Sequence, residues 1–325
     1  MPHNGVMQVS TSKHLRLRFW IAAVTLLFFG VILGWGLSVL LRTLPAVRMK
    51  LGGAAQDCSW SRTLSIDRDS RRFLALQRQA TQSVAILGHD EALGIDLLAS
   101  PGRVFWIKHA GQTMDGRKLL SYLLAEHDWM EEMSSESHVR PGDIVLDCGA
   151  HVGVFTAKAL ARGAARVVAI EPDPVHVECL RRNLHKEIAQ GRVTLLPEGV
   201  WSQEGRITLF AGVENSGGNS MVEQQQGGAT QVSVTTIDRL VQTLQLPRVD
   251  FIKMDIEGAE RHALRGALET LRKFRPRLMI DSYHLPDDMR VLPAIIRSAH
   301  SDYEMVCGPC GLLGNRVIPH VTFYR

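Results

Sequence analysis

The chain has 325 residues, of which 45% are hydrophobic and 22% are charged, so it can bury a sizeable core and is not a disordered protein. Its 37 Lys and Arg and 33 Asp and Glu give a formal net charge of +4. This charge is too small and too evenly spread to indicate a nucleic-acid-binding protein. The five cysteines are odd in number and irregularly spaced, which excludes a secreted disulfide framework and predicts reduced thiols.

An uncharged apolar segment, residues 19–41, follows an N-terminal tail of residues 1–18. As a helix with a rise of about 1.5 Å per residue it would measure roughly 34 Å, enough to cross a hydrocarbon core of about 30 Å. A cleaved signal peptide is the competing interpretation, but its apolar region usually has about 7 to 15 residues and ends at small residues. The segment is therefore predicted to be a transmembrane helix.

Basic residues flank this helix on both sides: Lys13, Arg16 and Arg18 precede it, and Arg42, Arg48 and Lys50 follow it. Because the two sides carry equal numbers, the positive-inside rule gives no orientation. Gly30 and Gly34 form a GxxxG pair that would let two helices pack closely, which leaves a homodimer open. Glycine is also simply common in membrane helices.

The region between the apolar segment and residue 137 divides into a linker and an extension. Residues 42–66 contain Pro45, Gly52 and Gly53 and are predicted to be a linker. Residues 67–137 are predicted to be a helical and mixed extension that packs on the domain after it. Its expected elements are a helix at 67–87, strands near 95–98 and 104–107, and a helix at 117–133.

Residues 138–325 alternate between apolar strands and helices. The expected strands are 144–148, 166–170, 192–196, 249–254 and 277–281, and the expected helices are 153–162, 174–190, 257–274 and 286–300. This alternation predicts a doubly wound α/β fold with a parallel sheet covered on both faces.

Three segments of this domain depart from the alternation. Residues 199–210 resemble a hairpin around Glu204-Gly205, and 303–307 with 320–325 are predicted to close the sheet as an antiparallel pair. The glycine-rich polar segment 212–229 is predicted to be a loop, and its length and position favour a cover over the site.

The first chemical motif is the sequence IVLDCGAHVG at 144–153. The predicted strand ends at Asp147, and the chain then turns through Gly149, Ala150 and Gly153. Small residues at such a turn let the backbone approach a ligand and let the next helix start close to the sheet. The turn is thus a candidate binding site for a small-molecule ligand.

The next predicted strand ends in Glu171-Pro172, where a carboxylate can accept both hydrogen bonds of a ribose diol. His151 occupies the position at which a dinucleotide-binding motif needs its second glycine, so room for a pyrophosphate is missing. The alternative is a generic βαβ turn in which the acid only caps the following helix.

The second motif, VDFIKMDIEGAE at 249–260, places acidic residues where a strand ends and a helix begins. Asp255 lies where the ligand cleft is expected, and Asp281 and His284 follow the neighbouring strand. Asp255 or His284 would act as a base, or Asp255 and Asp281 would bind a divalent ion through oxygen. Two carboxylates on strand ends are a weak signature, so no metal is predicted.

A purely structural interpretation of the second motif stays open. Glu257 and Glu260 fall in the predicted first turn of a helix, where carboxylates favour the macrodipole. Glu257 can also pair with Arg261 at i,i+4.

The first motif resembles that of class I S-adenosylmethionine-dependent methyltransferases, and Glu171 matches their ribose-binding acid. The run at 249–260, with Thr236-Ile-Asp238 and Pro141-Gly-Asp143, is similar to the FkbM family of methyltransferases, whose hallmark is D-F-I-K-x-D-x-E-G-A-E. The resemblance covers roughly residues 138–285. His151 departs from it, because the family commonly has Asn there.

The resemblance implies a Rossmann-like, mostly parallel sheet of seven strands in residues 138–325 and transfer of a methyl group from S-adenosylmethionine. The residues implied for the cofactor are Asp147, Gly149, Ala150, His151, Gly153, Glu171 and Pro172, and those implied for catalysis are Asp255, Glu257 and His284. The implied acceptor is a hydroxyl of a sugar, glycan or natural product. Because the cofactor is made in the cytosol, the domain is expected there, tethered to the membrane.

Two other functions stay open. One is a membrane-tethered scaffold that keeps the fold without the chemistry, and the other is a nucleotide-dependent oxidoreductase, which His151 disfavours. Cys307-Gly-Pro-Cys310 spells a redox motif, but its place near the end of the chain predicts a turn between two closing strands instead.

Overall fold

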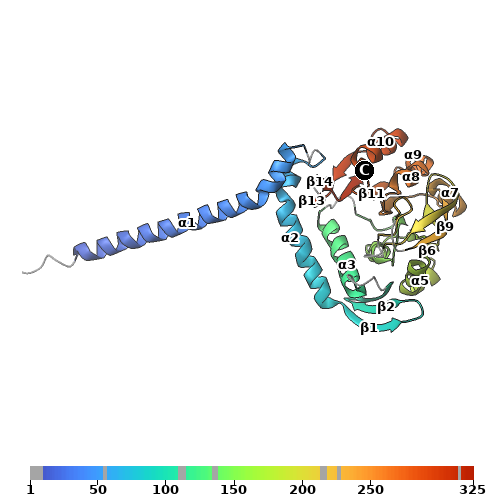
Figure 1. Cartoon of the computed structure of the whole chain (residues 1–325), viewed down its shortest axis with the longest axis horizontal. Coiled ribbons are helices and arrows are strands. Elements are labelled where there is room, and N and C mark those ends of the chain that lie inside the picture. The colour runs from blue at the N-terminus through green and yellow to red at the C-terminus, as the bar shows by residue number, and fades with distance from the viewer. Residues whose placement is uncertain are drawn as a thin grey trace, which may run out of the picture.

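The computed structural model describes residues 10–53, 57–108, 115–133, 138–212, 218–224, 228–313 and 316–325. The N-terminal elements are α1 (Ser10–Leu51), α2 (Trp60–Ser83), β1 (Ala85–Asp90), β2 (Ile95–Ser100), β3 (Arg103–Lys108) and α3 (Gly116–Met133). Figure 1 shows α1 leaving the body of the molecule as a long rod, with α2 and α3 side by side on the body.

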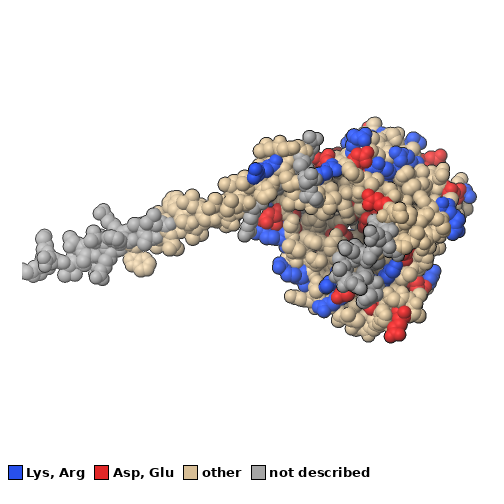
Figure 2. Space-filling view, in the orientation of Figure 1, with Lys and Arg blue, Asp and Glu red and all other residues tan. Residues whose placement is uncertain are grey.

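The rod contains one stretch, Leu27–Pro45, that is long and apolar enough to cross a membrane, and none of this stretch is buried against the protein. In Figure 2 the described part of the rod carries no charged side chain until it nears the body. A signal sequence near the N-terminus passes the same test of length and composition. The structure thus supports a helix able to span a membrane, and this stretch overlaps the predicted segment 19–41.

The predicted linker at 42–66 is wrong, because most of it is helical. Helix α1 continues through Pro45 to Leu51, and α2 begins at Trp60. A proline removes one backbone donor but does not stop a helix that is otherwise well formed, whereas Gly53 with φ +81° does end it. Ser59 then caps α2 by accepting a hydrogen bond from the Arg62 N–H.

The extension predicted at 67–137 consists of two helices and a three-stranded antiparallel sheet in the order β1-β2-β3. Strand β1 takes the end of the segment expected to be helical. The sheet packs on the following domain through Asn183, whose side chain donates to the Trp106 carbonyl at 2.8 Å and accepts from the Trp106 N–H at 2.5 Å. Phe73 of α2 contacts Tyr122 and Trp129 of α3.

The elements after residue 138 form the larger domain. Its strands are β4 (Ile144–Cys148), β5 (Arg166–Ile170), β6 (Val193–Leu196), β7 (Gly199–Val200), β8 (Gly205–Phe210), β9 (Ala229–Thr235), β10 (Phe251–Met254), β11 (Arg277–Asp281), β12 (Met305–Cys307), β13 (Cys310–Leu313), β14 (Arg316–Pro319) and β15 (Val321–Tyr324). Its helices are α4 (Val154–Ala161), α5 (Pro174–Asn183), α6 (His185–Ala189), α7 (Ile237–Thr243), α8 (Glu260–Arg265), α9 (Leu268–Phe274) and α10 (Asp288–Ala299).

The central sheet has seven strands in the order β12-β15-β11-β10-β4-β5-β6, and β15 alone runs antiparallel to its neighbours. Every residue of β4 and β10 is buried, as expected for strands covered on both faces. The predicted doubly wound, mostly parallel α/β fold is confirmed. The predicted pairing of the C-terminal strands is also confirmed, as β12 and β15.

The predicted hairpin at 199–210 is wrong. Strands β7 and β8 do not pair with each other, because β9 lies between them, parallel to β7 and antiparallel to β8. Strand β8 pairs with β9, whose residues alternate between polar and apolar, and not with β7 across the turn at Glu204-Gly205.

The structure joins Cys58, just before α2, to Cys310 at the start of β13 in a disulfide. The expectation of reduced thiols is therefore wrong for this pair, which lies 252 residues apart in the chain. Cys307 remains a free thiol and donates to the Asp57 carbonyl. The segment from Cys307 to Cys310 connects β12 to β13, which agrees with the predicted turn.

Candidate active site

The strand order of the central sheet reverses between β4 and β10, since the chain proceeds from β4 outward to β6 and later from β10 outward to β11. Ligands bind outside the carboxyl ends of the strands at such a switch point. A cleft that is open to solvent lies there. Its lining residues are Leu123, Gly149, His151, Ile170, Glu171, Pro172, His176, Glu198, Gly199, Val200, Leu209, Asn219, Met221, Asp255, Ile256 and Glu257.

Gly149 lets the two strand ends meet. It has φ +75°, and a Cβ at this position would lie 2.0 Å from the Asp255 carbonyl oxygen. The turn after β4 therefore packs directly on the segment after β10, and a side chain would force them apart.

We expect Gly149→Ala to lower the free energy of unfolding by about 2–5 kcal/mol, because it adds both a clash and a left-handed alanine. The matched control is Gly191→Ala, which has φ +70° but open space around the new Cβ, so its cost is about 1–2 kcal/mol. Denaturant unfolding of both variants checks this prediction. Equal losses would show that the close contact with Asp255 contributes nothing.

Glu171 lines the cleft and binds the backbone on both sides of it. Its carboxylate is buried and accepts from the backbone N–H groups of His151 and Asp173, both at 2.9 Å. The ring of His176 lies 3.4 Å away on the same carboxylate. Glu171 thus orients the turn after β4 while it lines the cleft.

The predicted cofactor residues divide into two groups. Gly149, His151, Glu171 and Pro172 line the cleft, whereas Asp147, Ala150 and Gly153 do not. Gly153 instead packs the start of α4 on Leu184, because a Cβ there would lie 2.9 Å from a Leu184 methyl group.

Asp147 is fully buried beneath the turn. It accepts from the Thr156 hydroxyl at 2.6 Å and lies 3.6 Å from the Lys253 ammonium. Burial raises the pKa of Asp147, and the Lys253 charge opposes that rise. The structure therefore places Asp147 as a support of the turn, and its contact with a cofactor stays a prediction.

Lys253 joins the two halves of the site. Its ammonium donates to the Gly149 carbonyl at 2.8 Å and lies 3.8 Å from the Asp255 carboxylate. Although burial opposes its charge, Asp147 and Asp255 hold the pKa of Lys253 above its usual value. The sequence motif contains this lysine, but only the pairing of β10 with β4 shows what it contacts.

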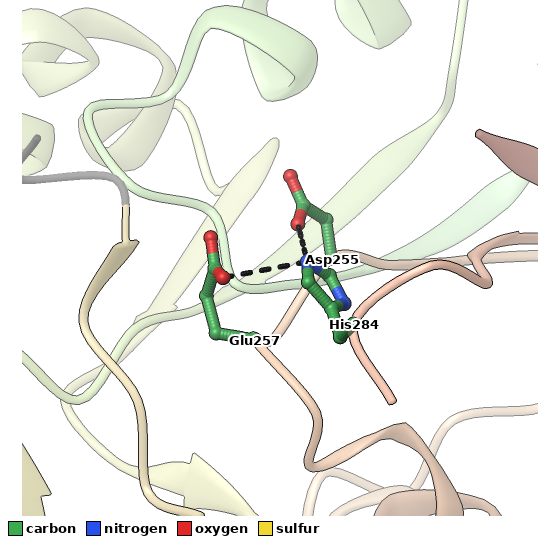
Figure 3. Close-up of side chains that lie close together, drawn as sticks. All are labelled: Asp255, Glu257 and His284. Atoms are coloured by element: carbon green, nitrogen blue, oxygen red, sulfur yellow. Dashed lines mark ion pairs between the residues drawn. The ribbon is translucent and has the colours of Figure 1, made fainter. Parts of the chain in front are cut away.

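The predicted catalytic residues Asp255, Glu257 and His284 come together at one end of the cleft. Figure 3 shows their side chains pointing toward one another, with the His284 ring between the two carboxylates. Its Nε2 lies 3.7 Å from Asp255 and 3.4 Å from Glu257. Glu257 has φ +53°, a strained conformation for a residue with a side chain.

The acidic residues and His284 at this end of the cleft shift one another's pKa values. Burial, with the Asp255 charge in addition, raises the pKa of Glu257 to about 8, against the attraction of His284. Burial lowers the pKa of His284, but Glu260, Glu257 and Asp255 together hold it well above its usual value. Perturbed groups gathered in a cleft are typical of functional sites.

The purely structural interpretation of the second motif holds for Glu260 but not for Glu257. Glu260 starts α8 and accepts from the Ile256 N–H at 2.9 Å, as a residue at a helix N-terminus does. The expected pairing of Glu257 with Arg261 is absent, because Arg261 binds Asp287 and Asp288 instead. Glu257 therefore faces the cleft.

Sequence reasoning missed the residues that other elements add to the site. Helix α3 brings Tyr122 and Glu126, whose side chains are hydrogen-bonded at 2.9 Å. Burial, together with the Asp255 charge, raises the pKa of Glu126 to about 7. No motif in the extension indicated this contribution.

The described part of the polar loop, residues 218–224, also reaches the site. Asn219 and Met221 line the cleft, and the Ser220 hydroxyl donates to the Glu257 carbonyl at 2.8 Å. The remainder of the predicted loop at 213–217 and 225–227 lies outside the described residues.

A doubly wound sheet with a cleft at its switch point is the architecture in which α/β proteins bind ligands outside the carboxyl ends of the strands. Residues 147–305 match the family model of the methyltransferase FkbM domain. This part of the chain is therefore an FkbM-type methyltransferase domain, as the two sequence motifs predict.

The curated relatives include methyltransferase sdnD of Sordaria araneosa, 28% identical over 38% of this chain and 60% of the relative. They also include the hexuronic acid methyltransferase AglP of Haloferax volcanii (28%, 40% and 52%) and the 31-O-demethyl-FK506 methyltransferase FkbM of Streptomyces tacrolimicus (27%, 39% and 60%). The chain thus spans between half and three-fifths of their lengths. Among solved structures, methyltransferase FkbM from Methylobacillus flagellatus KT is 19% identical, with a TM-score of 0.45 over 81% of this chain and 62% of that chain.

Proposed function

We propose that this chain is a membrane-anchored methyltransferase that transfers a methyl group from S-adenosylmethionine to a hydroxyl of a sugar, glycan or natural product. The observation that carries the proposal is the cleft at the sheet's switch point, which has Glu171 at one end and Asp255, Glu257 and His284 at the other. The FkbM-type domain and the relatives named for methylating a hexuronic acid or a natural product support it.

The residues of the cleft fit this cofactor. Ile170, Val200 and Met221 line the cleft and would offer apolar surface for a flat base, and Glu171 lines the same cleft and would accept from a ribose diol. The Nε2 of His176 is buried in this region without a hydrogen-bond partner among the described residues, so a polar group of a ligand would satisfy it. The cofactor, when bound, supplies an electrophilic methyl group on a sulfonium.

The chain's own residues then orient the acceptor and receive its proton. Methyl transfer is an in-line displacement, so positioning supplies much of the rate. A hydroxyl acceptor becomes a better nucleophile when a nearby base removes its proton. Asp255, Glu257 and His284 lie together where that hydroxyl would enter, and Asp255 stands next to the Gly149 turn.

A transfer assay with radiolabelled S-adenosylmethionine and a panel of sugars, uronic acids and polyketide alcohols tests the proposal on the full chain in detergent. We expect label in at least one hydroxyl acceptor, and a loss of about 100-fold or more in Asp255→Asn. Cofactor binding with no transfer to any acceptor would instead favour a scaffold that has kept only the fold.

The membrane orientation is a separate prediction. We propose that α1 is an anchor and that the domain faces the cytosol, where the cofactor is made. A reporter fused to the C-terminus should therefore be active only as a cytosolic reporter. An extracytoplasmic reporter signal would contradict the proposed orientation.

A further inference from the structure

We propose that Asp255, Glu257 and His284 bind one divalent metal ion at the acceptor end of the cleft. The three residues each offer one ligand atom, and these atoms lie within 4.8 Å of one another. Sequence reasoning predicted no metal, because it considered two carboxylates only. The third ligand, His284, changes the assessment.

The orientation of His284 is the observation that points to an ion. Its side chain is only 6% exposed, and Nδ1 is hydrogen-bonded to Glu260 at 3.0 Å. A carboxylate on one ring nitrogen fixes the tautomer and directs the lone pair of the other nitrogen, as in metal-binding histidines. That other nitrogen, Nε2, is buried without a hydrogen-bond partner among the described residues and faces the two carboxylates.

Glu260 is itself held firmly, so the ring has little freedom. It is completely buried, and the same oxygen that contacts His284 accepts from the Ile256 N–H. The orienting carboxylate, the ring and the strained backbone at Glu257 thus form a preorganised group rather than three mobile surface side chains.

The charges around the group leave a cation missing. Six carboxylates interact in this region: Asp147, Asp255, Glu257, Glu260, Asp281 and Glu126. A histidine that binds an ion is neutral, so Lys253 is the cation that then faces them among the described residues. A divalent ion would offset the repulsion among these carboxylates when they are ionised.

The ligand set indicates the kind of ion. One imidazole and two carboxylates suit Mn²⁺, Fe²⁺ or Zn²⁺, because imidazole and oxygen ligands are both acceptable to these ions. The separations of 3.4 and 3.7 Å from Nε2 need only a small contraction around an ion with bonds of about 2.1 Å. Remaining coordination positions would face the cleft.

The presence of a metal site does not depend on the proposed function, but a role for the ion in methyl transfer does. An ion here would hold the acceptor hydroxyl and polarise it, which makes its proton easier to remove. With Asp255, Glu257 and His284 occupied as ligands, the nearby carboxylates that are not ligands, Asp281 and Glu126, would receive that proton in their place. The O–CH₃ bond then forms as the S–CH₃ bond breaks, and the neutral thioether leaves.

The site is tested by treating the full chain with a chelator and then titrating it with Mn²⁺. Calorimetry and electron paramagnetic resonance both monitor the binding. We expect one ion per chain, and affinity at least about 100-fold weaker in His284→Gln and Glu257→Gln. Glu260→Gln, which keeps all three ligands but loses the orienting charge, should weaken binding by about 10–100-fold.

The matched control is Glu198→Gln, which removes a carboxylate from the same cleft but not from the ligand group. Its Mn²⁺ affinity should stay within about twofold of the parent. S-adenosylmethionine binding is measured on the same samples, so that loss of the cofactor site and loss of the metal site are separate results. Absence of a stoichiometric Mn²⁺ site, or equal affinity in all variants, would overturn the inference.

Discussion

Replacing Lys253 by Met should lower the free energy of unfolding by about 3–5 kcal/mol, one of the largest effects of a single change in this chain. Methionine matches the lysine stem in size, so the change removes mainly the charge. Asp147 and Asp255 would lose their buried partner, and the Gly149 carbonyl would lose its donor.

Denaturant unfolding of the full chain in detergent measures this effect. Lys273→Met provides the control, because Lys273 is exposed and lies over the ring of Phe274 in a cation–π arrangement. The free energy of unfolding of Lys273→Met should fall by about 1 kcal/mol or less. If Lys253→Met were as stable as Lys273→Met, the lysine could not be the link between the two halves of the site.

Glu171→Ala should weaken S-adenosylmethionine binding by about 100-fold or more. The two hydrogen bonds that a carboxylate accepts from a ribose diol contribute about 1.5–3 kcal/mol each, and the variant loses both. It also leaves the His151 and Asp173 N–H groups without their acceptor, so the turn after β4 is no longer held.

Glu178→Ala is the matched change for this experiment. Glu178 lies on α5, close in sequence, but pairs with Arg181 and Arg182 away from the cleft. Calorimetry should give this variant the parent affinity. Glu171→Ala with normal affinity would mean that the ribose is bound elsewhere, and the assignment of the whole cleft would fail with it.

The local sequence pattern was sufficient to predict most strands of the central sheet. Strands β5 and β11 have the predicted bounds, 166–170 and 277–281, because an apolar run between turn residues is already a complete description of a buried parallel strand. The ends of two predicted strands pointed to Glu171 and Asp255, and both residues line one cleft. Both lie at carboxyl ends of strands, and parallel topology brings such ends together.

The features that were missed depend on contacts between distant parts of the chain. Strand β9 separates β7 from β8, and Cys58 meets Cys310, although no local pattern marks either event. Glu126 reaches the site from an extension without any recognisable motif. The His284–Glu260 contact likewise joins residues 24 positions apart, so the direction of Nε2 could not be foreseen.

Calorimetric titration of the full chain in detergent with S-adenosylmethionine tests the central claim most directly. We expect a single site per chain with micromolar affinity, and no comparable binding of reduced nicotinamide dinucleotide, because His151 stands where a pyrophosphate would need room. A folded chain that binds no S-adenosylmethionine, or that prefers the dinucleotide, would contradict the proposed activity and leave only a shared fold.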